Sequence, residues 1–133
     1  MKTLLKLEEL AQLLLCLALF FLWDVPWWTY GLLLIGPDIG MLGYLVSPKV
    51  GAITYNILHH KGIALLVGIT AEVLVNSAPQ LEEPLIITAV ILFGHSCLDR
   101  MLGYGLKFGD HFQHTHLGWI GKARSAQQQG QEQ

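Results

Sequence analysis

Five polar residues lie inside stretches that are otherwise apolar enough to cross a lipid bilayer. They are Asp38, Asn56, His59, His95 and Asp99. An ionisable side chain at the centre of a bilayer costs about 3 kcal/mol on insertion scales, so it usually has a partner and a function. His95 and Asp99 are i and i+4, and Asn56 and His59 are i and i+3, so each pair shares one face of a helix. The pattern indicates a buried polar or metal site inside a helical bundle.

The strongest candidate ligand set for a divalent metal is Asp38, His59, His95 and Asp99. Such a site needs carboxylates and neutral imidazoles that converge from rigid elements. A mixed set of nitrogen and oxygen ligands suits zinc, manganese or iron. The competing interpretation is a structural network, in which Asp99 pairs with a basic neighbour and the histidines form hydrogen bonds across helices. The residues alone leave both interpretations open.

Two other polar residues are expected to support this site, and a group of histidines lies outside it. Asn56, one turn before His59, is expected to orient a site group. Arg100, beside Asp99, is expected to contact an anionic group of a substrate, and the alternative is a basic anchor at the cytoplasmic rim. A short histidine-rich stretch near the C-terminal end is weak evidence for a second metal site; it contains His111, His114 and His116.

The composition indicates a membrane protein. Of 133 residues, 53% are hydrophobic and 14% are charged, whereas soluble domains are about 25% charged. A soluble chain of this length buries too small a fraction of its surface to hide so much apolar area. The sequence has no basic stripe with interleaved aromatic residues, so no nucleic-acid partner is expected. The expected partner is the lipid bilayer, together with further copies of the chain or a larger membrane complex.

The predicted fold is all-α, a polytopic bundle of four membrane helices. The predicted spans are 4–23, 26–46, 49–76 and 84–106, in a single domain over 1–122, and 123–133 is predicted to be a disordered polar tail. Helix two is predicted to break at Pro37, because proline removes a backbone hydrogen bond and clashes with the preceding turn. Ser47 and Pro48 predict the next helix start, as an N-cap hydroxyl followed by a first-turn proline.

The third predicted span has His59, His60, Lys61 and Gly62 near its middle, so two topologies remain open. One helix of 28 residues gives four spans, whereas two short helices turning at Lys61 and Gly62 give five. Four spans place seven of the eight basic residues on one side, which satisfies the positive-inside rule and puts both termini in the cytoplasm. Lys61 is the exception, expected to snorkel or to pair with a carboxylate such as Asp38.

Three of the polar groups are expected at one depth. Asp38, His59 and His95 lie ten to twelve residues past the starts of their predicted helices. At 1.5 Å per residue this corresponds to about 15–18 Å, near the midplane of a hydrocarbon core about 30 Å thick. Three separate helices are therefore expected to present polar groups at the same level.

Three blocks of the sequence resemble a known family. They are residues 37–44 (PDIGMLGY), residues 51–59 (GAITYNILH), and residues 95–107 together with 115–118 (HSCLDRMLGYGLK and THLG). From about Leu4 to Ile120 the chain resembles the small bacterial integral-membrane family named domain of unknown function 4260. The resemblance implies a multi-pass protein of the bacterial inner membrane, and the family name implies no activity.

A looser similarity is to membrane-bound metal-dependent hydrolases. Those proteins have a Pro-Asp near a helix break, a histidine on the next span and a His-x3-Asp on a later one. The matching residues here are Asp38, His59, His95 and Asp99. A second acidic residue usually follows the Pro-Asp in those proteins, whereas Ile39 follows it here.

The leading hypothesis is metal-assisted hydrolysis of a lipid-soluble or phosphorylated substrate. A bound metal would lower the pKa of its water toward about 7. Asp38 and Arg100 would act in catalysis, as a ligand and as an anion contact. The alternative is a non-enzymatic membrane protein, either an accessory subunit or a small oligomeric transporter, which an unbroken helix from Lys49 to Asn76 would favour.

Overall fold

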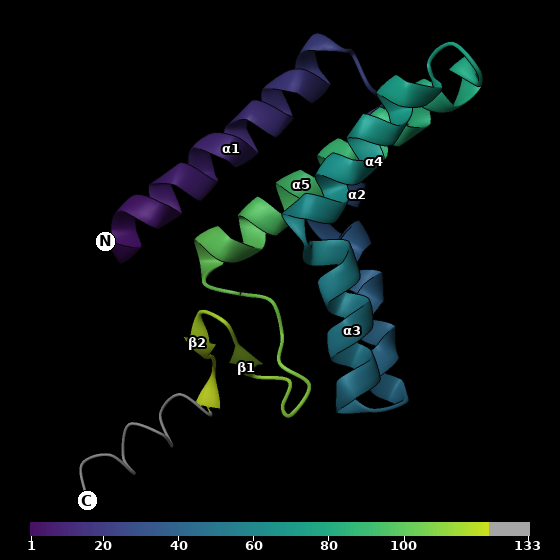
Figure 1. Cartoon of the computed structure of the whole chain (residues 1–133). Coiled ribbons are helices and arrows are strands. Elements are labelled where there is room, and N and C mark those ends of the chain that lie inside the picture. Colours follow the sequence, from purple (N-terminus) through teal and green to yellow (C-terminus); the bar gives the residue numbers. More distant parts are fainter. Residues whose placement is uncertain (123–133) are drawn as a thin grey trace, which may run out of the picture.

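The computed structural model describes residues 1–122 and is built almost entirely of helices (Figure 1). The helices are α1 (Lys2–Leu22), α2 (Trp28–Ile35), the 3₁₀ helix η1 (Gly36–Leu45), α3 (Pro48–His59), α4 (Lys61–Leu74), the short 3₁₀ helix η2 (Pro79–Leu81) and α5 (Glu82–Leu102). A two-stranded antiparallel ribbon follows, made of β1 (His114–Thr115) and β2 (Gly118–Trp119). The prediction of an all-α fold is confirmed, and the small ribbon is an addition to it.

The helices form two parts that meet at the middle of the molecule. Helices α1, α2 and α4 all pack against α5, which makes α5 the central helix of the upper bundle. Helix α3 packs along η1, and Figure 1 shows this pair projecting below the bundle. The ribbon lies below the end of α5 (Figure 1). Two chain segments, α2–η1 and α3–α4, therefore run through both parts.

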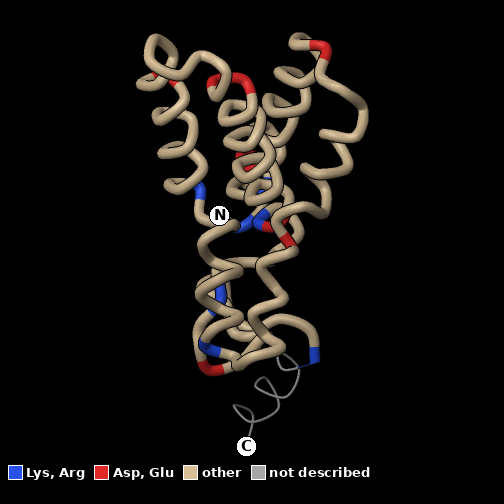
Figure 2. The backbone as a smooth tube through the Cα atoms, turned by 90° about the vertical axis from the view of Figure 1, so that its right-hand side faces the viewer, with Lys and Arg blue, Asp and Glu red and all other residues tan. Residues whose placement is uncertain are grey.

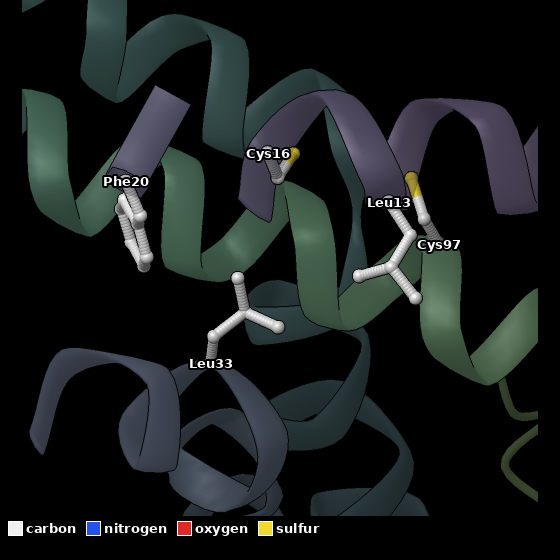
Figure 3. Close-up of a cluster of buried hydrophobic side chains, with 5 residues drawn as sticks. All are labelled: Leu13, Cys16, Phe20, Leu33 and Cys97. Atoms are coloured by element: carbon white, nitrogen blue, oxygen red, sulfur yellow. The ribbon is translucent and has the colours of Figure 1, made fainter. Parts of the chain in front are cut away.

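The core of the upper bundle is a cluster of buried side chains from α1, α2 and α5 (Figure 3). It consists of Leu13, Cys16, Phe20, Leu33 and Cys97. Both cysteines are free. A Cβ on Gly94 would lie 2.8 Å from Leu33 Cδ1, so the missing side chain allows α2 to approach α5 closely. This approach places the main chain of α2 beside the next residue of α5, His95.

The second helical segment breaks at Pro37, as predicted. The α-helix ends at Ile35, and the chain continues as 3₁₀ helix from Gly36. Because proline lacks an amide hydrogen, a regular α-helix loses a hydrogen bond at this point. Asp38 therefore lies in the first turn of η1.

The η1–α3 hairpin depends on very close packing. A Cβ on Gly51 would lie 2.2 Å from the ring of Tyr44, and a Cβ on Gly43 would lie 2.2 Å from Thr54 Oγ1. Thr54 Oγ1 donates a hydrogen bond to the carbonyl of Gly40 at 2.6 Å. Small residues allow two helix backbones to approach in this way, and they are common where helices pack in membranes.

The third helical segment begins as predicted and then breaks. The hydroxyl of Ser47 accepts a hydrogen bond from the amide of Val50 at 3.1 Å, and Pro48 opens α3. The helix ends at His59, because His60 adopts extended backbone angles and its imidazole caps α4 by accepting from the amide of Gly62. The axes of α3 and α4 differ by 49°. The break falls at His60 rather than at Lys61–Gly62, and the bend does not reverse the chain.

The last helix ends earlier than predicted. Gly103 has a φ of 97°, a left-handed conformation that favours glycine, and it ends α5 at Leu102 rather than at residue 106. The amide of Gly103 donates to the carbonyl of Arg100 at 3.1 Å, and the amide of Tyr104 donates to that of Asp99 at 2.8 Å. The chain therefore turns back at this point.

By length and composition, one helix in the described part of the chain could cross a membrane, the continuous segment Pro79–Leu102 of 24 residues. The bent pair α3–α4 is a second if its two helices form one span. Helix α1 contains Lys6, Glu8 and Glu9 in its first half, and α2 has only eight residues. Four membrane spans therefore remain a prediction. The predicted tail, 123–133, lies outside the described residues.

Candidate metal centre

The helix breaks bring all four residues of the predicted ligand set together. Asp38 comes from η1, His59 is the last residue of α3, and His95 and Asp99 lie one turn apart on α5. Oδ1 of Asp38 lies 3.5 Å from Nε2 of His59 and 3.5 Å from Nε2 of His95. Asp99 approaches His59 Nε2 with Oδ2 at 3.5 Å and His95 Nε2 with Oδ1 at 3.9 Å. Three elements thus bring two imidazoles and two carboxylates together, with Asp38, His59 and His95 as the closest group of ligand atoms and Asp99 beside them.

Main-chain carbonyls fix the orientation of both imidazoles. Nδ1 of His59 lies 2.8 Å from the carbonyl oxygen of Tyr55, and Nδ1 of His95 lies 2.9 Å from that of Leu33. A carbonyl oxygen can only accept, so each Nδ1 carries the hydrogen and each Nε2 of the neutral ring has a free lone pair. Both Nε2 atoms are buried and have no hydrogen-bond partner among the described residues. Two unused nitrogen lone pairs therefore face the carboxylates.

The tautomer is the one that metal ligation requires. Histidines that bind a metal through one nitrogen usually donate the other N–H to a carbonyl or carboxylate, which fixes the orientation of the ring. One ligand atom each from Asp38, His59 and His95 lies within 4.8 Å of the other two. The side chains of the two histidines are 3% and 2% exposed, Asp99 is 17% exposed, and Asp38 is 41% exposed. The cluster is thus closed on its imidazole side and open at Asp38.

Tyr55 supports the cluster in three ways. Its ring stacks on the imidazole of His59, with centroids 3.7 Å apart. Its hydroxyl donates a hydrogen bond to Oδ2 of Asp99, and its carbonyl accepts from His59. Asn56, not Tyr55, was expected to orient a site group in this turn. The spacing of four residues between Tyr55 and His59, which places both on one helix face, was the available signal.

Asn56 binds the main chain rather than an imidazole. Its Nδ2 donates to the carbonyl of Lys107 at 2.8 Å, and its Oδ1 accepts from the amide of Lys107 at 2.7 Å. This pair of hydrogen bonds ties the segment that follows α5 to α3. Asn56 was expected to orient a site group directly. It instead anchors the main chain of Lys107, which is not part of the cluster.

Arg100, the other predicted catalytic residue, lies beside the cluster. It lines a small recess together with Tyr55, His59, Ser96, Asp99, Tyr104, Gly105 and Leu106. The recess has no room for a water molecule. Arg100 is therefore a neighbour of His59 and Asp99, and its contact with a substrate stays a prediction.

Lys61 pairs away from the cluster. Its Nζ lies 2.5 Å from Oε2 of Glu9 and 2.6 Å from Oε1 of Gln12, both on α1. Lys61 therefore pairs with a carboxylate, as expected, but with Glu9 rather than Asp38, because α1 supplies the nearer group. As a consequence, the carboxylate of Asp38 remains with the two histidines.

The three C-terminal histidines do not form a second cluster. Each uses its Nδ1 within its own loop: His114 with Asp110 at 2.7 Å, His116 with the amide of Leu106 at 2.8 Å, and His111 with the amide of Gln113 at 3.1 Å. The hydrogen bond from His114 holds the pKa of Asp110 below its usual range. Within residues 1–122 the only group of three ligand atoms within ion-binding distance is the cluster described above.

The fold and the site define a small all-α protein with two buried histidines and two aspartates gathered where its helices break. The chain belongs to the family described as Domain of unknown function (DUF4260), whose model matches residues 2–120. No curated protein and no solved structure matches the chain. The family resemblance is thus confirmed, whereas a similarity to metal-dependent hydrolases is not shown by these comparisons.

Proposed function

We propose that the protein binds a divalent metal through Asp38, His59, His95 and Asp99 and uses it for hydrolysis within a membrane. One observation supports this proposal more than any other. Two buried Nε2 lone pairs, each fixed by a carbonyl behind its ring, face two carboxylates without a hydrogen bond to either. Buried polar atoms are rarely left without a partner. A bound cation would satisfy all of them at once.

The spacing of the ligand atoms favours zinc. Ligand bonds of about 2.0–2.2 Å in tetrahedral geometry separate neighbouring ligand atoms by roughly 3.3–3.6 Å. The two separations between Asp38 Oδ1 and the imidazole nitrogens are both 3.5 Å. Asp99 approaches the two imidazoles with different oxygens, at 3.5 Å and 3.9 Å, and lies outside the group of three ligand atoms that are within 4.8 Å of one another. An octahedral ion with bonds of about 2.1 Å would bring neighbouring atoms to roughly 3.0 Å. Manganese and iron are the other candidates for this ligand set.

The proposed chemistry follows from the ligand set. A divalent metal held in this way would supply an activated water at neutral pH. The side chain of Asp38 is 41% exposed, so water has access to its carboxylate, and Arg100 lies beside His59 and Asp99. Tyr55 keeps Asp99 oriented through its hydroxyl. These residues fit hydrolysis of a lipid-soluble or phosphorylated substrate.

Residence in a membrane is supported by the surface of the molecule. Large apolar side chains are exposed both on the upper bundle and on the hairpin, among them Leu14, Leu15, Phe21, Leu42, Leu45, Ile53, Ile57, Leu65, Leu66 and Ile69. In Figure 2 the basic residues lie in the middle and at the lower end, whereas acidic residues lie at the upper end and also in the middle and at the lower end. The scarcity of basic residues at the upper end agrees with the positive-inside rule for a chain whose lower end is cytoplasmic.

Four spans with both termini on one side agree with the position of the chain ends. Lys2 and Thr3 of α1 line the same groove as Gly118 and Gly121, so the two ends of the described chain lie together. Segments α2–η1 and α3–α4 would each cross as one broken span, with the cluster near mid-depth. Broken helices at membrane depth occur where they line a protein-buried or watery cavity. We extend the proposal to a multi-pass protein of the bacterial inner membrane with cytoplasmic termini.

The non-enzymatic alternative has less support. It was favoured by an unbroken helix from Lys49 to Asn76 and by Lys61 facing a partner protein. The helix breaks at His60, and Lys61 pairs with Glu9 of the same chain. A homo-oligomer or a larger complex is compatible with the exposed apolar surface in either case.

The test is the metal content of protein purified in detergent. We expect about one zinc, manganese or iron per chain, which is lost in His95→Ala. His60→Asn is the matched control, because it removes a neighbouring imidazole but keeps an N-cap acceptor for α4. It should retain the metal. Wild-type protein without metal after zinc loading, or equal metal content in His95→Ala, would contradict the proposal.

A further inference from the structure

A groove lies between the first turns of α1, the end of α5 and the ribbon (Figure 1). Its volume is about 1070 Å³, whereas clefts that bind small molecules typically have roughly 300–1,000 Å³. The three segments that form it are far apart in the sequence. None of its lining residues belongs to the proposed metal centre. The groove is therefore a second place where a ligand of substantial size fits.

The charge of the groove is entirely positive. Among the described residues that line it, Lys2 and Lys6 are the only charged side chains. They are i and i+4 on α1, so they share one face of the helix. Within residues 1–122, no ion pair includes either ammonium group. Basic residues in the first turns of a helix add to the positive end of its macrodipole, so the stability of α1 does not explain them.

The rest of the wall is mainly apolar and aromatic. Aliphatic side chains come from all three segments, and two rings with polar tips lie among them: the six residues are Leu5, Leu102, Leu117, Ile120, Tyr104 and Trp119. Leu5, Leu102 and Leu117 are each roughly half exposed, so the groove leaves them uncovered. Tyrosine and tryptophan are enriched at the level of lipid headgroups. A ligand with an anionic group and a hydrocarbon chain would match both kinds of wall.

We propose that the groove binds an anionic phospholipid, with its phosphate beside Lys2 and Lys6 and its acyl chains on the apolar wall. The inference takes residence in a membrane from the proposed function but does not depend on the metal. Lys2 and Gly121 both line the groove, so the proposed topology places it on the cytoplasmic side, where anionic lipids attract basic segments. A soluble anion would leave the apolar wall uncovered, and a neutral lipid would leave both ammonium groups without a counter-ion.

The test is native mass spectrometry of the full-length protein in detergent, titrated with phosphatidylglycerol and with phosphatidylcholine of the same acyl chains. We expect phosphatidylglycerol to bind about tenfold more tightly, because its headgroup forms charge-assisted hydrogen bonds without a cation of its own. The double variant Lys2→Gln/Lys6→Gln should lose this preference, and Lys2→Arg/Lys6→Arg should keep it. Lys49→Gln is the control, since Lys49 is an exposed lysine of α3 outside the groove.

The apolar wall is tested by a second pair of variants. Leu5→Gln should weaken the binding of both lipids, because it removes apolar surface that the acyl chains cover. Leu4→Gln is the control, because Leu4 is exposed on the same turn of α1 but does not line the groove. It should bind both lipids like wild type.

Equal affinity for phosphatidylglycerol in wild type and in Lys2→Gln/Lys6→Gln, or an equal loss in Lys49→Gln, would overturn the inference. So would a wild-type dimer without bound lipid that the double variant converts into monomers, because a second copy would then be the occupant. His95→Ala, which should lack the metal, should bind phosphatidylglycerol like wild type. The inference and the proposed metal centre can therefore fail separately.

Discussion

At the residue scale, the distance between the imidazoles and the carboxylates is the decisive quantity. A network held by hydrogen bonds would place each Nε2 about 2.8–3.0 Å from a carboxylate oxygen and would need a hydrogen on that nitrogen. The carbonyls of Tyr55 and Leu33 fix the hydrogen on Nδ1 instead. The separations of 3.5 Å leave room for an ion between the ligand atoms. These separations therefore support the proposed metal site over a network of direct hydrogen bonds between neutral imidazoles and the carboxylates.

Removal of the Tyr55 hydroxyl should weaken metal binding without removing a ligand. Tyr55→Phe keeps the ring stacked on His59 but leaves Asp99 without its hydrogen-bond donor. Loss of such an outer contact typically costs 10–100-fold in metal affinity, so we expect a decrease of that size in competition with a chelator. Tyr44→Phe is the control, because the Tyr44 hydroxyl is buried without a partner among the described residues. Equal affinity in the two variants would contradict the assigned function of Tyr55.

The sequence indicated which residues approach one another, but not the contacts that fix the orientation of their side chains. Counting from helix starts placed Asp38, His59 and His95 at one depth, and the structure brings them together. Carbonyl partners such as that of Leu33 depend on how two helices pack, here on the small size of Gly94, and no local pattern encodes that contact. The Glu9 partner of Lys61 is 52 residues away in sequence and was missed for the same reason.

At the element scale, the breaks in the helices position the site. Pro37 and the Ser47–Pro48 start were readable from the sequence, because proline and a capping hydroxyl act within one turn. The favoured single helix of 28 residues does not form, and the alternative break at Lys61–Gly62 was placed one residue late, since a histidine side chain that caps α4 has no strong sequence signature. The ribbon at 114–119 was not predicted, because each of its strands has only two residues.

The contact between η1 and α3 should be highly sensitive to added volume. Gly51→Ala places a Cβ against the ring of Tyr44, which cannot move without shifting the hairpin. We expect a loss of about 1–3 kcal/mol in stability and a lower midpoint of thermal unfolding in detergent. Gly31→Ala is the matched change, since nothing lies within 4 Å of its Cβ. It should be neutral or stabilise α2 by about 0.5–1 kcal/mol. Similar midpoints for both variants would show that the packing is looser than described.

At the scale of the whole molecule, the cluster lies where the upper bundle meets the hairpin. Helix α4 has 14 residues and α3 has 12, which corresponds to about 39 Å along the bent pair. This length is sufficient for a hydrocarbon core of about 30 Å. On the proposed four-span topology, the upper end with its acidic residues and the lower end with its basic residues would lie in opposite aqueous phases (Figure 2). The cluster would be near mid-depth.

The two termini should lie on the same side of the membrane. Reporter fusions at Met1 and at Gln133 are both expected to report the cytoplasm, because an even number of spans returns the chain to its starting side and the basic residues favour that side. A fusion placed between α4 and α5, near Gln80, is the control and should report the opposite side. An N-terminal fusion inside and a C-terminal fusion outside would require five spans and would remove the shared depth of the cluster.

The metal centre itself is tested most directly by X-ray absorption spectroscopy of the zinc-loaded protein. The account predicts a first shell of nitrogen and oxygen at about 2.0–2.1 Å with the outer scattering of two imidazoles. In His95→Ala, which should lose the metal, this first shell should be absent. A shell of oxygen alone, a shell containing sulfur from Cys16 or Cys97, or an unchanged spectrum in His95→Ala would contradict the assignment of the metal to this cluster.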